Sequence, residues 1–151
     1  MQTRIERQSV YNLRPELPKA LISLAGAASS TIGDQLSHLI KIRCSQINGC
    51  AFCLHMHSAE ARSHGEKQYR LDTLSAWQNT TWFSDRERAA LAFSESLTNL
   101  ANGEISDEVF SKLKAQFSDQ EIVDLTAAIV AINGWNRVVA AMHFIPEEVS
   151  G

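Results

Sequence analysis

The sequence predicts an all-α fold, a compact bundle of about six to seven helices in one domain that spans residues 1–151. Proline, the strongest helix breaker, occurs only at positions 15, 18 and 146. No stretch keeps the apolar–polar alternation of a half-buried strand for long. No repeat, linker or low-complexity segment divides the chain, and its length is enough to bury one core.

The first half of the chain predicts four helices after an irregular arm over residues 1–12. Pro15 is suited to the start of the first helix, since its fixed φ matches the helical one. The second helix covers about residues 33–46. Asn48-Gly49 then marks a turn, and a third helix follows over residues 51–64, where Gly65 ends it. A shorter helix covers about residues 67–77.

Three serine caps predict the helices of the second half. Ser84 and Ser118 are each followed three residues later by glutamate, the capping-box pattern, and Ser106 opens a helix between them. The last helix is the longest and ends before Pro146.

The last helix also predicts an oligomer. Residues 122–132 are apolar on nearly every face, and a helix apolar all round must be covered all round. In a domain this small, a second copy of the chain is the expected cover, so we predict a homo-oligomer. We expect no membrane-spanning helix here, since polar residues interrupt the apolar window, namely Asn133, Asn136, Arg137 and His143.

Composition narrows the functional classes. With 44% hydrophobic and 21% charged residues, the chain has the make-up of an ordinary globular protein. A formal charge of −3 predicts neither nucleic acid nor an anionic membrane as partner. Residues 1–7 lack the apolar segment of a secretory signal. Three cysteines do not fit a secreted disulfide scaffold, so we expect a cytoplasmic location, where a close cysteine pair is catalytic or metal-binding.

The stretch around Cys50 and Cys53 is the predicted functional centre. At 100° per residue, Cys50, Cys53 and His57 fall on one helix face. Cys50 lies at the helix N-terminus, where free N–H groups and the dipole favour a thiolate. Two thiols one turn apart can form a disulfide, and an imidazole one turn further can accept a thiol proton. The pattern therefore predicts a redox dithiol with its own base.

Other chemistries for these residues are weaker. Zinc could use Cys50, Cys53 and His57 with His38 or His143, but structural zinc sites usually take ligands from two separate elements. Haem attachment is excluded because Leu54, not histidine, follows Cys53. A thioredoxin-like fold needs strands before the cysteines, and the sequence shows no strand pattern there. Outside the dithiol we expect Cys44 to be a buried small residue, and Phe52 and Met56 to face the core.

Residues 45–62, with the sequence SQINGCAFCLHMHSAEAR, resemble the carboxymuconolactone decarboxylase superfamily in its alkylhydroperoxidase-D-like branch. The segments LSAW at 74–77 and SDRERAALAF at 84–93 resemble the same branch, so the likeness covers roughly residues 35–100. The true lactone decarboxylases generally lack the cysteine pair. The resemblance implies an all-helical subunit assembled as a trimer or hexamer, and reduction of peroxides by the dithiol.

Carried over to this chain, the resemblance implies that Cys53 is the attacking thiolate, Cys50 the resolving thiol and His57 part of a proton relay. Two positions depart from the family motif. His38 stands where the motif has a glutamate twelve residues before the first cysteine, and Phe52 stands where it has a histidine. We expect His38 to lie within hydrogen-bond reach of His57, directly or through one water, and to assist the relay.

These observations predict a thiol-dependent peroxidase that needs no metal or cofactor. Its partners would be a peroxide substrate and an external thiol or dithiol protein that reduces the disulfide. Two alternatives remain open, a redox-sensing or thiol-exchange protein with little peroxide turnover and a metal-binding structural module.

Overall fold

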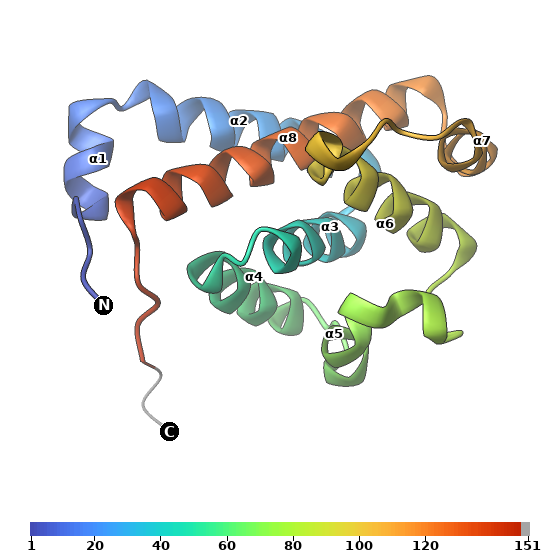
Figure 1. Ribbon diagram of the computed structural model, residues 1–151, viewed down its shortest axis with the longest axis horizontal. Helices are drawn as coiled ribbons and strands as arrows, with labels where there is room; N and C mark the ends of the chain where they lie inside the picture. The colour runs from blue at the N-terminus through green and yellow to red at the C-terminus, as the bar shows by residue number, and fades with distance from the viewer. Residues whose placement is uncertain (149–151) are drawn as a thin grey trace.

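The computed structural model describes residues 1–148, and in them the chain is all-helical (Figure 1). Its eight α-helices and two 3₁₀ segments are α1 (Arg7–Leu13), α2 (Glu16–Ile32), α3 (Asp34–Ile47), α4 (Ala51–Ser63), α5 (Gln68–Thr73), η1 (Leu74–Asn79), α6 (Asp85–Thr98), η2 (Leu100–Asn102), α7 (Asp107–Gln116) and α8 (Asp119–Met142). The described residues contain no strand. The predicted all-α class is therefore confirmed, with eight α-helices where about six to seven were expected.

The predicted irregular arm over residues 1–12 is wrong in its second half, because α1 begins at Arg7, whereas residues 1–6 are irregular. This helix has only one buried residue, Val10, and therefore no apolar stripe that a periodicity would detect. Tertiary contacts hold it instead. The Tyr11 ring contacts the Trp135 ring of α8, and the Arg7 guanidinium lies 5.8 Å from the centre of the Phe52 ring of α4.

The capping signals fix the helix starts of the second half as predicted. Ser84 and Ser118 each accept a hydrogen bond from the backbone of the glutamate three residues on, and each glutamate bonds back. Ser106 caps α7 by accepting a hydrogen bond from the Val109 N–H, without a return bond. The predicted helix over residues 67–77 is α5 followed by η1, with a kink at Ala76.

Helix α3 lies at the centre of the bundle (Figure 1). One side of it packs with α2, α6 and α8 in the main core, through Leu36, Ile40 and Cys44. The opposite side packs with α4, α5 and η1 through Leu39 and Ile42. This placement fixes α4, which carries the cysteines, between α3 and the end of α8.

Helices α2 and α8 run side by side along the top of the molecule in Figure 1. Gly134 permits their close approach, because a Cβ there would come within 2.9 Å of Leu21 Cδ2 and push that side chain away. By length and composition alone α8 could cross a membrane, but it packs against α2 and α3 as a core helix.

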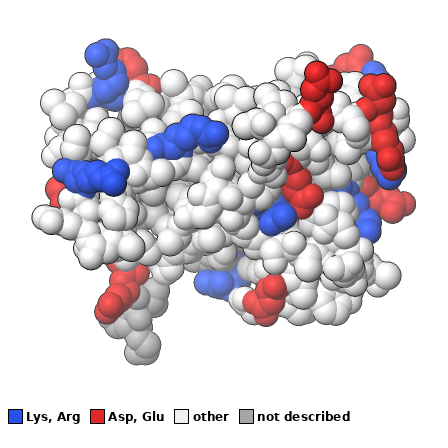
Figure 2. All heavy atoms as spheres, viewed as in Figure 1, with Lys and Arg blue, Asp and Glu red and all other residues white. Residues whose placement is uncertain are grey.

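The rest of the chain covers helix α8 only in part. Its own chain buries most of the apolar stretch, yet Val123 and Val130 are 62% and 51% exposed. The middle of the face in Figure 2 is largely uncharged, and acidic side chains gather at the α7 end. Exposed valines on α8 suit a second copy of the chain, and the homo-oligomer stays a prediction.

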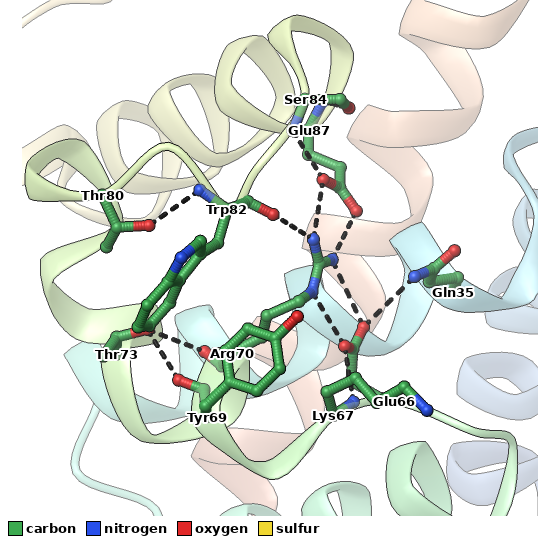
Figure 3. Close-up of polar contacts among 10 residues, drawn as sticks. All are labelled: Gln35, Glu66, Lys67, Tyr69, Arg70, Thr73, Thr80, Trp82, Ser84 and Glu87. Carbon is green, nitrogen blue, oxygen red and sulfur yellow. Dashed lines mark hydrogen bonds and ion pairs between the residues drawn. The ribbon is translucent and has the colours of Figure 1, made fainter.

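A buried ion-pair cluster joins the loop between α4 and α5 to α5 and α6 (Figure 3). Arg70 bonds through Nε to Glu66 at 2.8 Å and through Nη2 to Glu87 at 2.6 Å. Its Nη1 donates to the Trp82 carbonyl, and Glu87 also accepts from the Ser84 backbone N–H at 2.8 Å. One guanidinium thus fixes the loop between α5 and the start of α6.

Candidate functional site

The turn between α3 and α4 sets the position of the first cysteine. Asn48 ends α3 and Gly49 adopts φ 64°, the left-handed conformation that glycine takes without strain. The Cys50 N–H then donates to the Ser45 carbonyl at 2.9 Å and the Gly49 N–H to the Gln46 carbonyl at 3.3 Å, which is a Schellman motif. The predicted Asn-Gly turn is confirmed, with only Gly49 at positive φ.

Side chains of α8 hold this turn in place. The Asn48 amide donates to the side-chain oxygens of Asn133 and Asn136, at 2.9 Å each. Asn136 is 3% exposed and donates to the Ser45 hydroxyl at 3.0 Å. A buried amide with both groups bonded is strongly oriented, so the start of α4 is fixed relative to the core.

Cys50 and Cys53 form a disulfide, with their Cα atoms 5.3 Å apart. Cys50 is the N-cap of α4, and its sulfur accepts a hydrogen bond from the Cys53 N–H at 3.3 Å. A sulfur at this position receives the positive end of the helix dipole, which favours the thiolate form after reduction. Cys44 is the buried small residue that was predicted, and burial raises the pKa of its thiol to about 11.

A cavity of about 400 Å³ opens beside the dithiol. Cys53 and His57 line it, whereas Cys50 does not. Much of its wall is apolar and comes from α2, α4, α8 and the segment after α8, with side chains of Ile22, Phe52, Met56, Ile132, Trp135 and Phe144. The volume lies within the range of small-molecule sites.

The prediction that Phe52 and Met56 belong to the core is wrong for Met56 but holds in part for Phe52, which packs against a buried cluster that includes Val139 and Phe144. Met56 is 38% exposed, Phe52 is partly buried, and both line the cavity. Phe52 and Met56 are four positions apart and therefore share one face of α4, next to the face that Cys53 and His57 share. Phe52 and Met56 thus form the cavity wall next to the reactive sulfur.

His57 forms one hydrogen bond that the sequence analysis did not consider. Its Nδ1 lies 2.8 Å from Oε2 of Glu60, one turn further along α4. The side chains are 9% and 43% exposed. The hydrogen bond from His57 lowers the pKa of the Glu60 carboxyl and outweighs burial, which raises it. The i, i+3 spacing was the available signal, because such pairs share a helix face.

His38 is buried on α3, and its ring centre lies 5.1 Å from that of His64. Its Nδ1 has no hydrogen-bond partner, and no direct hydrogen bond joins it to His57 within residues 1–148. Burial lowers the pKa of His38, and nearby Lys41 adds to the effect. A neutral imidazole therefore lies behind the site, and its part in the relay stays a prediction.

The ligands considered for zinc are not gathered. In the part of the chain that the structure describes, no three His, Cys, Asp or Glu side chains are arranged to hold a metal ion. His143 lies at the end of α8, where its Nδ1 bonds the Gln2 carbonyl at 2.9 Å.

The comparisons with known proteins agree with this architecture. The model of the carboxymuconolactone decarboxylase family matches residues 15–96, more than half of the chain. The chain therefore belongs to the carboxymuconolactone decarboxylase family. It is 38% identical to the uncharacterized protein YdfG of Bacillus subtilis (strain 168) over 138 residues, 91% of this chain and 94% of YdfG.

Solved structures place the fold in the AhpD-like branch. A protein of unknown function from Agrobacterium tumefaciens, proposed to be the antioxidant defence protein AhpD, is 36% identical with a TM-score of 0.89. The match covers 98% of this chain and all of that one. The debrominase Bmp8 is 24% identical with a TM-score of 0.77, covering 90% of this chain and 74% of Bmp8, which is likeness of fold alone.

Proposed function

We propose that this protein is a thiol-dependent peroxidase of the alkyl hydroperoxide reductase type. One observation carries the proposal: of the two bonded cysteines, Cys53 faces a substrate-sized cavity, and His57 lines the same cavity one turn away. The likeness to a protein proposed to act in antioxidant defence supports it.

The reaction begins with reduced cysteines. His57 accepts the Cys53 proton, and the thiolate attacks the terminal oxygen of the peroxide. The O–O bond breaks, the alkoxide leaves and takes the proton from His57, and Cys53 becomes a sulfenic acid. The Cys50 thiolate then attacks the Cys53 sulfur, forming the disulfide and releasing hydroxide, which is protonated to water.

The cycle closes when an external thiol or dithiol protein reduces the disulfide by exchange. This step belongs in a reducing cytoplasm, where such donors are abundant. No metal or cofactor enters the scheme. The apolar cavity wall favours an organic peroxide over hydrogen peroxide, because burial of its carbon chain contributes binding energy. Assembly as a trimer or hexamer belongs to the same proposal.

His38 is the second member of the proposed relay, and its environment also motivates a rival function. The family glutamate is absent there, and the imidazole makes no hydrogen bond to His57. If peroxide attack requires that carboxylate at position 38, the dithiol would oxidise and exchange with partner thiols without significant turnover. The protein would then be a redox sensor or thiol-exchange protein.

Steady-state peroxide consumption, with mass spectrometry of the thiols, separates the two functions. We expect the wild type to consume an organic hydroperoxide catalytically and to form the Cys50–Cys53 disulfide. Cys53→Ser should abolish oxidation, and Cys50→Ser should retain a sulfenic acid on Cys53. A sulfenic acid on Cys50 in Cys53→Ser, with no oxidation of Cys50→Ser, would reverse the roles. A disulfide without turnover would favour the rival function.

A further inference from the structure

The proposed base is held by a carboxylate on its own helix. Glu60 Oε2 lies 2.8 Å from His57 Nδ1, and the His57 side chain is 9% exposed while that of Glu60 is 43% exposed. Because both residues belong to α4, their spacing is set by the helix and needs no other element. The pair is therefore part of the rigid frame that also carries Cys53.

The hydrogen bond determines which ring nitrogen can act as a base. Glu60 is ionised at neutral pH, since its carboxyl has a lowered pKa, and an ionised carboxylate only accepts hydrogen bonds. Nδ1 must then carry the hydrogen, and its N–H donates a hydrogen bond to the Glu60 carboxylate. The free lone pair is left on Nε2, at the other side of a ring that lines the cavity with Cys53.

We propose that Glu60 is the positioning residue of His57, in the place of the family glutamate that position 38 lacks. The inference rests on the proposed function for its chemistry, because the base matters only if Cys53 must lose a proton. Glu60 selects the tautomer of His57, fixes the plane of its ring, and stabilises the imidazolium that forms when the thiol proton arrives. A carboxylate acts in the same way on the histidine of a serine-protease triad.

Other charged and titratable groups near His57 do not take this role. His38 and Lys41 approach from α3, Arg7 of α1 lines the same cavity as His57, and His64 lies at the end of α4. The His38 ring lies against the His64 ring at an interplanar angle of 40°, and its Nδ1 has no hydrogen bond. A neutral imidazole, a lysine and an arginine carry no negative charge, so none offers the charge attraction by which a carboxylate stabilises an imidazolium. Glu60 is the carboxylate that is bonded to His57.

The test measures alkylation of the reduced Cys50→Ser protein by iodoacetamide across pH, which follows the Cys53 thiolate without peroxide. Glu60→Gln removes the charge, Glu60→Asp keeps it, and Glu108→Gln makes the same change at an exposed position on α7. We expect Glu60→Gln to lower the neutral-pH rate on the order of 10²-fold. At high pH, where the thiol ionises without a base, the rates should converge.

Glu60→Asp should restore most of the rate, and Glu108→Gln should match the parent. A merely structural role for Glu60 would instead change the rate at every pH. If the alkylation rate of Glu60→Gln follows that of the parent at every pH, the inference is wrong. It is also wrong if His38→Ala lowers the neutral-pH rate and Glu60→Gln does not. Peroxide consumption is measured in parallel on proteins that retain Cys50. A wild type that fails to consume peroxide while the alkylation profiles differ would reject the peroxidase and leave the positioning role standing.

Discussion

Replacing Arg70 by methionine should destabilise the fold more than the loss of any surface ion pair would. Arg70 is 11% exposed in its side chain, and the two carboxylates that it bonds, on Glu66 and Glu87, are 4% and 14% exposed. Methionine keeps much of the apolar volume but leaves two buried negative charges facing each other (Figure 3). It also removes the donor to the Trp82 carbonyl and the cation over the Phe83 ring.

The magnitude follows from the burial of the cluster. Breaking a buried ion pair by removing one partner costs about 3–5 kcal/mol, because the remaining charge stays desolvated. Natural domains have a free energy of unfolding of roughly 5–15 kcal/mol, so the loss is a large fraction of the total. For a chain of this size each kcal/mol shifts the melting temperature by about 2–4 °C, which gives a fall of roughly 6–20 °C.

Urea and thermal unfolding, followed by circular dichroism at fixed protein concentration, measure this loss. The matched control is Lys112→Met, which breaks an exposed pair with Glu108 and should have no measurable effect. Removing a carboxylate together with the cation, in Arg70→Met with Glu66→Gln, should be less destabilising than Arg70→Met alone. A loss below about 1 kcal/mol for Arg70→Met would place the cluster in the range of solvent-screened pairs and refute the reasoning.

Two further predictions concern assembly and acid. Light scattering in dilute neutral buffer should give a mass that is a multiple of 16.7 kDa. Val130→Asp should lower this mass, because Val130 is 51% exposed on α8 and the change places a charge in the expected interface. A monodisperse monomer for the wild type would contradict the predicted oligomer. His38 has a pKa that burial lowers below its ordinary 6.5, so between these two values the unfolded chain binds a proton that the folded chain does not. Stability should therefore fall as pH drops below about 6.5, and His38→Gln should flatten urea-unfolding stability against pH in that window; equal slopes would contradict it.

The sequence predicted the helices that have strong local signals. Ser84 and Ser118 open α6 and α8 because a capping box satisfies backbone donors within four residues. Gly65 ends α4 because it takes φ 91°, and the Glu66 N–H then bonds the Ala61 carbonyl at 2.9 Å. Helix α1 escaped prediction since its stability comes from contacts with α4 and α8, which no local pattern encodes.

The cysteines and His57 could be placed from spacing alone, because one helix carries all three. The surroundings of His38 could not, since they depend on how α3 packs against α4. Glu60 lay within reach of the same spacing argument. The family motif has its carboxylate at position 38, where this chain has histidine, and Glu60 offers the same chemical group three residues after His57.

The position of the two thiols is fixed by contacts that do not involve the disulfide. The Cys50 N–H bonds to Ser45, Asn48 bonds to two asparagines of α8, and Cys53 belongs to the first turn of α4. None of these contacts depends on the oxidation state of sulfur. The helix therefore keeps the sulfurs within reach of each other after reduction, and the Cys50 N-cap retains a donor in the Cys53 N–H. Each oxidation can then proceed without unwinding α4, which suits the proposed peroxidase cycle.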